Sequence, residues 1–196
     1  MARVSCGGSH VIAMSSEGAL YSWGRNHCGQ LSRGTITPYE STPALVVGFE
    51  PKEQVTQIAC GESHTLVLVM YSSRDGSTKS LIYAWGDGSR GQLGSGDEHF
   101  KHRPQENRWV TKLLVKYNFS AVSIAAGANH NLVLSSTGQV GSWGGGDYGQ
   151  LGHGSMWDDE APRVINDLTG MLILVLVFVL VLFLVVIDVI QHMQHN

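Results

Sequence analysis

One motif occurs three times in this chain with the same internal spacing. Each copy reads Trp-Gly, four variable residues, then Gly-Gln-Leu, at 23–31, 85–93 and 143–151, and a Gly-x-x-His element precedes each copy. The tryptophans lie 62 and then 58 residues apart, a period typical of stacked or circular repeat architectures. One such unit cannot bury its apolar face alone, so the motif first predicts a fold. The repeated residues are Gly7, His10, Trp23, Gly24, Gly29, Gln30, Leu31, Gly61, His64, Trp85, Gly86, Gly91, Gln92, Leu93, Gly127, His130, Trp143, Gly144, Gly149, Gln150 and Leu151.

Between the two elements, the first unit has two strand-like runs, 11–14 and 19–23, around a polar turn that ends in glycine. This pattern predicts a β-hairpin. The third unit repeats it with the same His-to-Trp distance, whereas the second lengthens the turn by eight residues, through 71–80. Insertions at exposed hairpin tips cost little entropy and often carry function. The candidate interaction loop therefore comprises Tyr71, Arg74, Asp75 and Lys79.

The segments after each Trp-Gly read as tight turns whose glycines supply positive φ or permit close backbone approach. Only 109–117 places apolar residues loosely on one helical face: Trp109, Leu113, Leu114 and Tyr117. We therefore predict an all-β domain over 1–169, with units near 4–57, 58–123 and 124–169.

These marks together resemble the regulator of chromosome condensation repeat, over most of residues 4–165. Kelch and WD repeats differ in period and signature. The first copy departs from the pattern because Ser32 stands where the others have Gly94 and Gly152. The resemblance implies a seven-bladed β-propeller with one four-stranded blade per repeat. Three repeats imply a partial propeller of about three blades with two open flanks, so we interpret the chain as a fragment, a splice form or a degenerate copy.

Residues Met171 to Ile187 are 17 consecutive apolar residues. As a helix, this run spans roughly 26 to 30 Å, about the hydrocarbon thickness of a bilayer. We predict a C-terminal transmembrane helix within 170–190 and a short tail, 191–196, with the repeats on the cytoplasmic face of a membrane. The alternatives are a non-native end of the chain, with the protein in cytoplasm or nucleus, and, least favoured, a buried strand, which would be far too long for a blade.

The repeated histidines His10, His64 and His130 could suggest a zinc site. Because each occupies the same position in a different unit, we expect them to lie apart, each bonding within its own blade. We expect the repeated tryptophans to pack between blades. Cys6, Cys60 and Ala126 also share a repeat position, which favours a small buried side chain there.

The net charge of −3 gives no general reason to expect nucleic-acid binding. The local exception is the basic stretch 101–116, where we favour a solvated loop over a phosphate-binding site. Two Gly-x-Gly-x-x-Gly patterns, at 86–91 and 144–149, match the dinucleotide fingerprint, but Gln-Leu-Gly and further turn residues follow instead of a helix. We assign no catalytic, cofactor-binding or metal-binding residues.

The sequence thus predicts a non-enzymatic protein-interaction scaffold without cofactors, tethered to a membrane or part of a larger propeller. Its partners would be other proteins, with nucleic acid disfavoured and a membrane contacted through the C-terminal segment. The alternative implied by the resemblance is guanine nucleotide exchange on a small GTPase.

Overall fold

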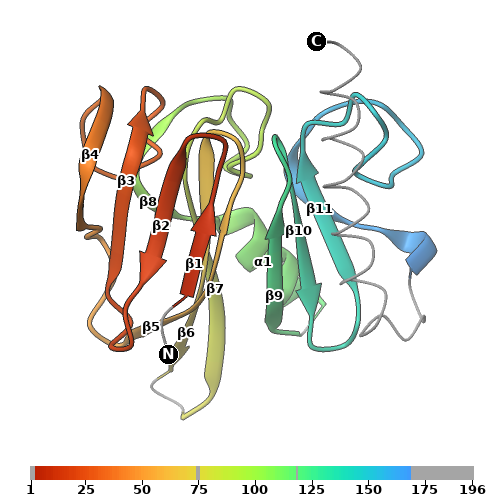
Figure 1. Ribbon diagram of the computed structural model, residues 1–196. Coiled ribbons are helices and arrows are strands. Elements are labelled where there is room, and N and C mark those ends of the chain that lie inside the picture. Colours follow the sequence, from red (N-terminus) through yellow and green to blue (C-terminus); the bar gives the residue numbers. More distant parts are fainter. Residues whose placement is uncertain (1–2, 74–75, 118, 169–196) are drawn as a thin grey trace.

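The computed structural model describes residues 3–73, 76–117 and 119–168, and these form three four-stranded antiparallel sheets (Figure 1). We call each sheet a blade. In every blade the strands follow sequence order. The first comprises β1 (Arg3–Cys6), β2 (His10–Met14), β3 (Leu20–Asn26) and β4 (Thr37–Leu45). The second comprises β5 (Glu53–Cys60), β6 (His64–Ser72), β7 (Thr78–Gly86) and β8 (Lys101–Glu106). The third comprises β9 (Ala121–Ala126), β10 (His130–Ser135), β11 (Val140–Gly144) and β12 (Asp159–Val164).

The first strands of the three blades are neighbours. β1 contacts β5, and β5 contacts β9. In Figure 1 these strands lie toward the middle of the molecule, whereas β4 lies at its margin. Each blade therefore extends outward from a shared inner edge, and its two faces are available to the blades beside it. The all-β prediction with about three four-stranded blades is confirmed for the described residues.

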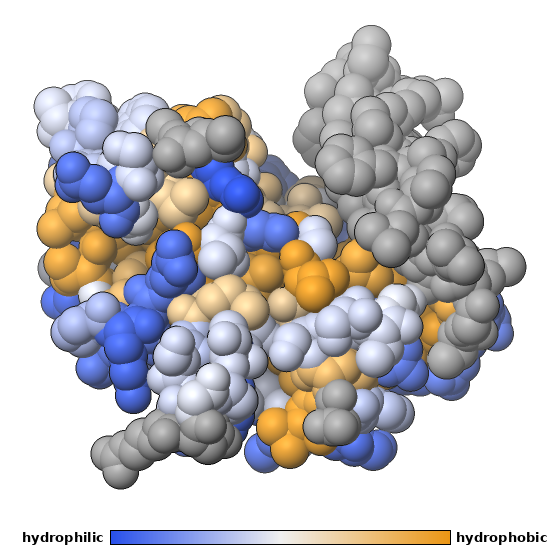
Figure 2. Space-filling view, turned by 90° about the horizontal axis from the view of Figure 1, so that it is seen from below, coloured by the Kyte–Doolittle hydropathy of each residue, from blue (hydrophilic) through white to orange (hydrophobic). Residues whose placement is uncertain are grey.

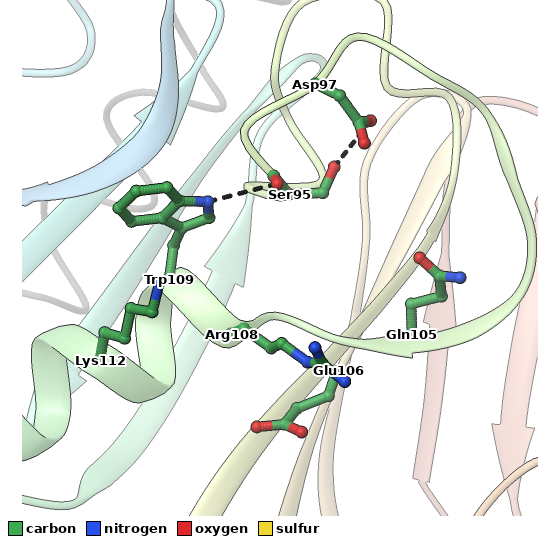
Figure 3. A pocket seen from close by; sticks show the side chains of 7 residues that line it. All are labelled: Ser95, Asp97, Gln105, Glu106, Arg108, Trp109 and Lys112. Carbon is green, nitrogen blue, oxygen red and sulfur yellow. Dashed lines mark hydrogen bonds between the residues drawn. The ribbon is translucent and has the colours of Figure 1, made fainter.

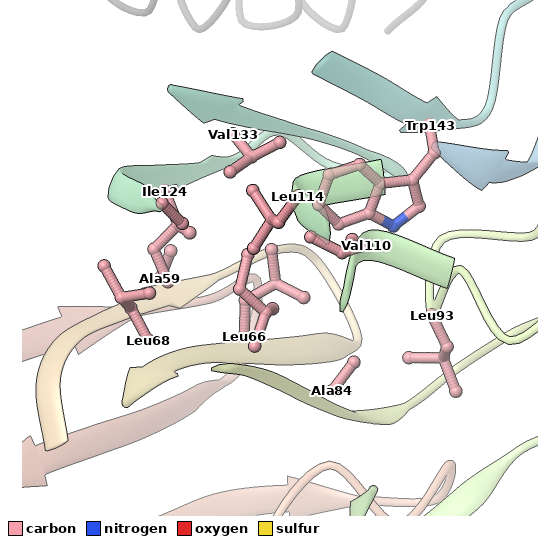
Figure 4. Close-up of a cluster of buried hydrophobic side chains, with 12 residues drawn as sticks. Ala59, Leu66, Leu68, Ala84, Leu93, Val110, Leu114, Ile124, Val133 and Trp143 are labelled. Atoms are coloured by element: carbon pink, nitrogen blue, oxygen red, sulfur yellow. The ribbon is translucent and has the colours of Figure 1, made fainter. Parts of the chain in front are cut away.

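The hydrophobic core lies between the blades. One cluster joins the first and second blades and includes Ile12, Val67 and Trp85. Another joins the second and third blades and includes Leu66, Val133 and Trp143 (Figure 4). Because these apolar faces are buried by a neighbouring blade, the second blade completes the core of both blades beside it. A smaller cluster of Leu132, Val140 and Ile165 belongs to the third blade itself.

Within 3–73, 76–117 and 119–168, two short helices accompany the sheets: α1 (Arg108–Lys116), between the second and third blades, and η1 (Asn166–Leu168). The prediction of a solvated loop over 101–116 is therefore wrong, because this stretch forms β8 and α1. Asn107 caps the helix: its side chain accepts a hydrogen bond from the Val110 amide and donates one to the Leu93 carbonyl.

Val110 and Leu114 anchor α1 because both are buried in the cluster between the second and third blades (Figure 4). The buried face of α1 thus differs by about one residue from the face that the sequence suggested. Trp109 and Tyr117, expected on the packed face, are 44% and 42% exposed.

The long hairpin of the second blade is mostly strand. β6 and β7 pair as far as Ser72 with Thr78, so the predicted turn 71–80 contributes several residues to the ladder. Tyr71 pairs with Lys79 across the two strands. Arg74 and Asp75 lie outside the described residues.

The predicted transmembrane segment, Met171–Ile187, also lies outside the described residues. Among the residues that the structure describes, no helix has the length and apolar character needed to cross a membrane.

The Trp-Gly turns adopt the same backbone in all three blades. Their glycines have positive φ, with 104° at Gly24, 100° at Gly86 and 104° at Gly144. Ser32 follows the same course, with a φ of 59° where Gly94 has 61°. The first turn therefore keeps the repeat geometry although its serine occupies a region that disfavours side chains.

Candidate functional site

The repeated residues meet at the boundary between blades. At the first junction, which we define as His10, Gln30, Thr65 and Trp85, the Gln30 carbonyl of the first blade accepts a hydrogen bond from Trp85 Nε1 at 2.8 Å. Thr65 Oγ1 donates to the same carbonyl at 3.4 Å. His10 Nε2 lies 3.0 Å from Thr65 Oγ1. The side chains of Thr65 and Trp85 thus meet at the Gln30 carbonyl, and that of His10 lies beside them.

The second junction repeats this network with His64, Gln92, Asn131 and Trp143. The Gln92 carbonyl accepts from Trp143 Nε1 at 3.0 Å and from Asn131 Nδ2 at 2.6 Å. His64 Nε2 lies 2.8 Å from Asn131 Oδ1. Buried polar groups are costly unless they are hydrogen-bonded, and here each junction supplies partners from both blades. The two sequence marks are therefore parts of one inter-blade contact.

The expectation that each histidine bonds within its own blade is wrong for His10 and His64. Both reach the residue that follows the repeated histidine of the next blade, Thr65 and Asn131. Burial lowers the pKa of each imidazole from 6.5 to about 4, and the neighbouring His64 adds to the effect at His10. Both rings are thus neutral near pH 7, and they act as hydrogen-bonding groups in the packing between blades.

The sequence did contain a signal for the missed partners. The residue after the repeated histidine is Thr65 or Asn131 in the second and third units, but Val11 in the first. In the described residues, only these later blades receive a histidine from a preceding blade. A polar residue at this position therefore marks a blade that closes a junction.

Side chains that lack a neighbouring blade in the described part are less buried. Trp85 and Trp143 are fully buried, whereas Trp23 is half-buried. The same contrast holds for cysteine. Cys60 is buried beside β1, and burial raises the pKa of its thiol to about 11. Cys6 is exposed, so the expected buried position is wrong there.

The loops that follow each Trp-Gly, 27–36, 87–100 and 145–158, lie at the same end of the blades, at the top of Figure 1. The second and third loops are joined by Arg90, whose guanidinium contacts the carboxylates of Asp147 and Asp158. The contacts with Asp158 are bidentate, at 2.9 and 2.7 Å. This geometry restrains two loops from different blades against each other.

Large apolar side chains are exposed at this end in all three blades, on the loops or just beyond them. In the third loop Met156 is 71% and Trp157 80% exposed. Phe100 in the second loop is 45% exposed, Ile36 in the first is 53% exposed, and Tyr39 just beyond the first is 71% exposed. We call these five residues the loop-end apolar residues. They occupy variable positions of the repeat and contribute little to the core, which makes them candidates for contact with another protein.

The hairpin tips lie at the opposite end of the blades (Figure 1). Seen from below, this end alternates hydrophilic with hydrophobic areas (Figure 2). The candidate residues Tyr71 and Lys79 belong to the long hairpin that projects here (Figure 1). Lys52 lies 6.0 Å from the centre of the Tyr71 ring. This hairpin remains a predicted interaction element.

A shallow pocket of about 520 Å³ lies beside the start of α1, on the second blade. Figure 3 shows the side chains that line it, from the loop after β7, from β8 and from α1. They are Ser95, Asp97, Gln105, Glu106, Arg108, Trp109 and Lys112. Asp97 already bonds Ser95 and Lys101, and Trp109 Nε1 donates to the Ser95 carbonyl. The pocket combines cations, carboxylates and one aromatic ring.

The three successive blades, their adjacent first strands and the repeated junctions are consistent with part of a β-propeller, so the class is a propeller-type repeat protein. The sequence profile described as "Regulator of chromosome condensation (RCC1) repeat" matches residues 17–68, 80–134 and 137–178. A second profile of the same description matches 2–30 and 121–150. The chain belongs to the regulator of chromosome condensation repeat family.

Relatives of this chain are larger proteins. The human "Probable E3 ubiquitin-protein ligase HERC3" is 34% identical over 168 residues, which cover 86% of this chain and 15% of the relative. The "Protein RCC2 homolog" of Danio rerio is 30% identical over 181 residues, which cover 83% of this chain and 34% of the relative. The chain thus corresponds to a minor part of each of these proteins.

Two solved structures share the fold. The crystal structure of human WBSCR16 superposes with a TM-score of 0.68 at 26% identity, over 83% of this chain and 39% of that one. Prp20p from Saccharomyces cerevisiae superposes with a TM-score of 0.66 at 23% identity, over 83% and 37% of the two chains. Both matches leave more than half of the other structure uncovered.

The matched repeats do not coincide with blades. The repeat 17–68 runs from the first hairpin through β3, β4 and β5 into β6. It therefore contains the outer strands of one blade and the inner strands of the next. The repeat 80–134 does the same for the second and third blades, so these two matched repeats each cross a junction. The chain itself thus connects the blades that the hydrogen bonds hold together.

Proposed function

We propose that the chain is a non-enzymatic protein-interaction module whose binding surface is the loop end. The observation that carries this proposal is the exposure of large apolar side chains at this end in each of the three blades. Met156 and Trp157, with most of their surface exposed, are its centre. Aromatic residues and methionine are enriched in protein interfaces, and a Trp of this kind is a typical energetic centre of binding.

The frame beneath the loops supports the proposal. Loops on a rigid scaffold can vary in sequence while the fold is kept. The junctions fix the blades to one another, and Arg90 joins the second and third loops. A partner would therefore meet side chains whose relative positions are set before binding, which lowers the entropic cost of association.

The test compares two triple variants of the chain. The loop-end variant carries Phe100→Ser, Met156→Ser and Trp157→Ser. The control variant carries Val4→Ser, Leu45→Ser and Val122→Ser, which are also exposed apolar residues but lie on strands rather than on the loops. Both variants should unfold cooperatively, because none of these positions is buried.

Each form is then purified from cells and its bound proteins are quantified by mass spectrometry. We expect at least one protein to be present at equal stoichiometry with the wild type and the control variant, and to be lost with the loop-end variant. Retention of all bound proteins by the loop-end variant contradicts the proposal.

Nucleotide exchange is the alternative activity, and it has its own assay. Small GTPases loaded with a fluorescent guanine nucleotide are incubated with residues 1–169, and nucleotide release is recorded. The non-enzymatic proposal predicts that the nucleotide is released no faster with residues 1–169 than without them. A strong acceleration that Trp157→Ser abolishes would show that the loop end serves exchange and that the non-enzymatic proposal is wrong.

A further inference from the structure

Helix α1 presents a basic face to solvent. Its buried residues, Val110 and Leu114, point toward the core, while Arg108, Lys112 and Lys116 are all exposed. These three residues are spaced by four, so they follow one another along one side of the helix. We call them the basic stripe.

The cations of the stripe form no ion pair within the part of the chain that the structure describes. Lys112 Nζ lies 4.4 Å from the centre of the Trp109 ring, and Lys116 Nζ lies 5.2 Å from that of Tyr117. Cation–π contacts orient an ammonium group without neutralising its charge. The stripe therefore retains three positive charges beside aromatic rings, on a chain with a net charge of −3.

The N-terminus of α1 adds to the positive potential. The first turn of α1 holds no acidic residue, so Arg108 adds to the positive end of the helix dipole. The two carboxylates that line the pocket, Asp97 and Glu106, already have partners within the chain. Glu106 accepts from Thr111 Oγ1 at 2.9 Å, and Asp97 pairs with Lys101 at 3.1 Å. An anionic partner would be attracted here by charge complementarity.

The spacing of the stripe fits an extended peptide. Four residues of α-helix advance about 6 Å, so Arg108, Lys112 and Lys116 are separated by about 6 Å along the axis. Alternate side chains of an extended strand lie about 6.6 to 6.8 Å apart on the same face. A segment of the form Glu-x-Glu-x-Glu can therefore place one carboxylate near each cation.

The pocket favours a peptide over nucleic acid. It opens at the Arg108 end of the stripe and includes the carboxylates of Asp97 and Glu106 (Figure 3). These carboxylates would repel any continuous run of anions, but they can accept hydrogen bonds from the backbone N–H groups that flank the acidic residues of a peptide, and a phosphate backbone offers no such donors. The Trp109 ring, which a base could stack on, already has Lys112 over one face.

We propose that α1 and the adjoining pocket form a second protein-binding surface, which takes an extended acidic segment of a partner protein with alternating carboxylates. The surface is distinct from the loop end and goes beyond the function proposed above. The pocket receives the part of the segment that precedes or follows the carboxylates.

The test measures binding of a fluorescein-labelled Ser-Glu-Ser-Glu-Ser-Glu-Ser peptide to the full chain by fluorescence anisotropy. The stripe variant carries Arg108→Gln, Lys112→Gln and Lys116→Gln. The control variant removes the same charge from exposed positions elsewhere, Arg3→Gln, Arg25→Gln and Lys52→Gln. A peptide with Gln in place of Glu and a short labelled oligothymidylate complete the set.

We expect the Glu peptide to bind the wild type and the control variant within about twofold, and the stripe variant about tenfold or more weakly. The Gln peptide should not bind. Equal weakening by the control variant, or no binding of the Glu peptide to the wild type, overturns the proposal. Tighter binding of the oligothymidylate, lost in the stripe variant, overturns it in favour of a nucleic-acid surface.

Folding and the first proposal are controlled separately. Far-ultraviolet circular dichroism and thermal unfolding of the stripe variant should match those of the wild type, since its changes are on the exposed face of α1. The loop-end variant should bind the Glu peptide normally. Failure of peptide binding would therefore leave the result at the loop end standing.

Discussion

Acid should weaken the contacts between blades through the two buried junction histidines. Both His10 and His64 are almost inaccessible to solvent, and the pKa of each is lowered from 6.5 to about 4. For both rings, burial is the largest cause. The Nδ1 atoms of both make no hydrogen bond within the described residues. Protonation would place a charge at these atoms, inside the junction.

The direction of the pH effect follows from these values. A histidine whose folded pKa is depressed stabilises the fold fully above the unfolded pKa of 6.5, and this contribution is lost as the pH falls toward 4. Linkage gives a loss of about 2 kcal/mol per histidine between about pH 7 and pH 5. The two junctions together should therefore lose about 3 to 4 kcal/mol.

Urea unfolding followed by tryptophan fluorescence measures this loss, because Trp85 and Trp143 belong to the same junctions. In a His64→Gln variant the amide can still donate to Asn131 but does not titrate. Its stability should be lower near pH 7, but it should fall by only about 2 kcal/mol on acidification. A wild-type stability that changes by less than about 1 kcal/mol between these pH values would refute the reasoning.

Three further predictions address the turns and the C-terminal segment. Ser32→Gly should raise the melting temperature and add about 1 kcal/mol of stability, because Ser32 has a φ of 59° and a buried hydroxyl without a hydrogen bond in the described residues; a lower melting temperature contradicts this. Gly91 and Gly149 share a φ of 71°, but a Cβ at Gly91 would lie 2.6 Å from Glu160 Cα, whereas one at Gly149 would meet nothing described within 4 Å. Urea midpoints should therefore show that Gly91→Ala costs about 2 kcal/mol or more beyond Gly149→Ala, and equal costs would count against the packing described. The predicted span 171–187 should keep the full chain in carbonate-extracted membranes, and a chain ending at 169 should be released; extraction of both forms would exclude a membrane anchor.

The strands and turns of each blade were predictable because their signals are local. A polar turn with glycine between two short apolar runs specifies a hairpin, whichever blade stands beside it. The turn after each Trp-Gly was predicted to use its glycines for positive φ or for close backbone approach, and Gly29, Gly91 and Gly149 have positive φ, at 79°, 71° and 71°. Ser32 shows that the surrounding structure, and not the glycine itself, sets the backbone at that position.

The partners of the junction histidines were not predictable in the same way. His64 meets Asn131 across 67 residues of sequence. The polar residue after the repeated histidine is a signal of a junction, but by itself it does not say which histidine it meets. The proximity of His64 and Asn131 depends on how one blade stacks on the next. The prediction of the packed face of α1 failed for a related reason. The space between two blades decides which side of the helix is buried, and it holds Val110 and Leu114 instead of the larger Trp109.

The sharing of each junction between neighbours also bears on how the molecule opens. Among the residues that the structure describes, the second blade contributes to both junctions, whereas the first and third each contribute to one. In such a linear array, cooperative stability is a sum of nearest-neighbour couplings. The outer blades can separate singly, at the expense of one coupling each, while the amides of β6 become accessible to solvent only when both couplings are lost. Hydrogen exchange should therefore be slowest at the centre of the array and become faster toward each side.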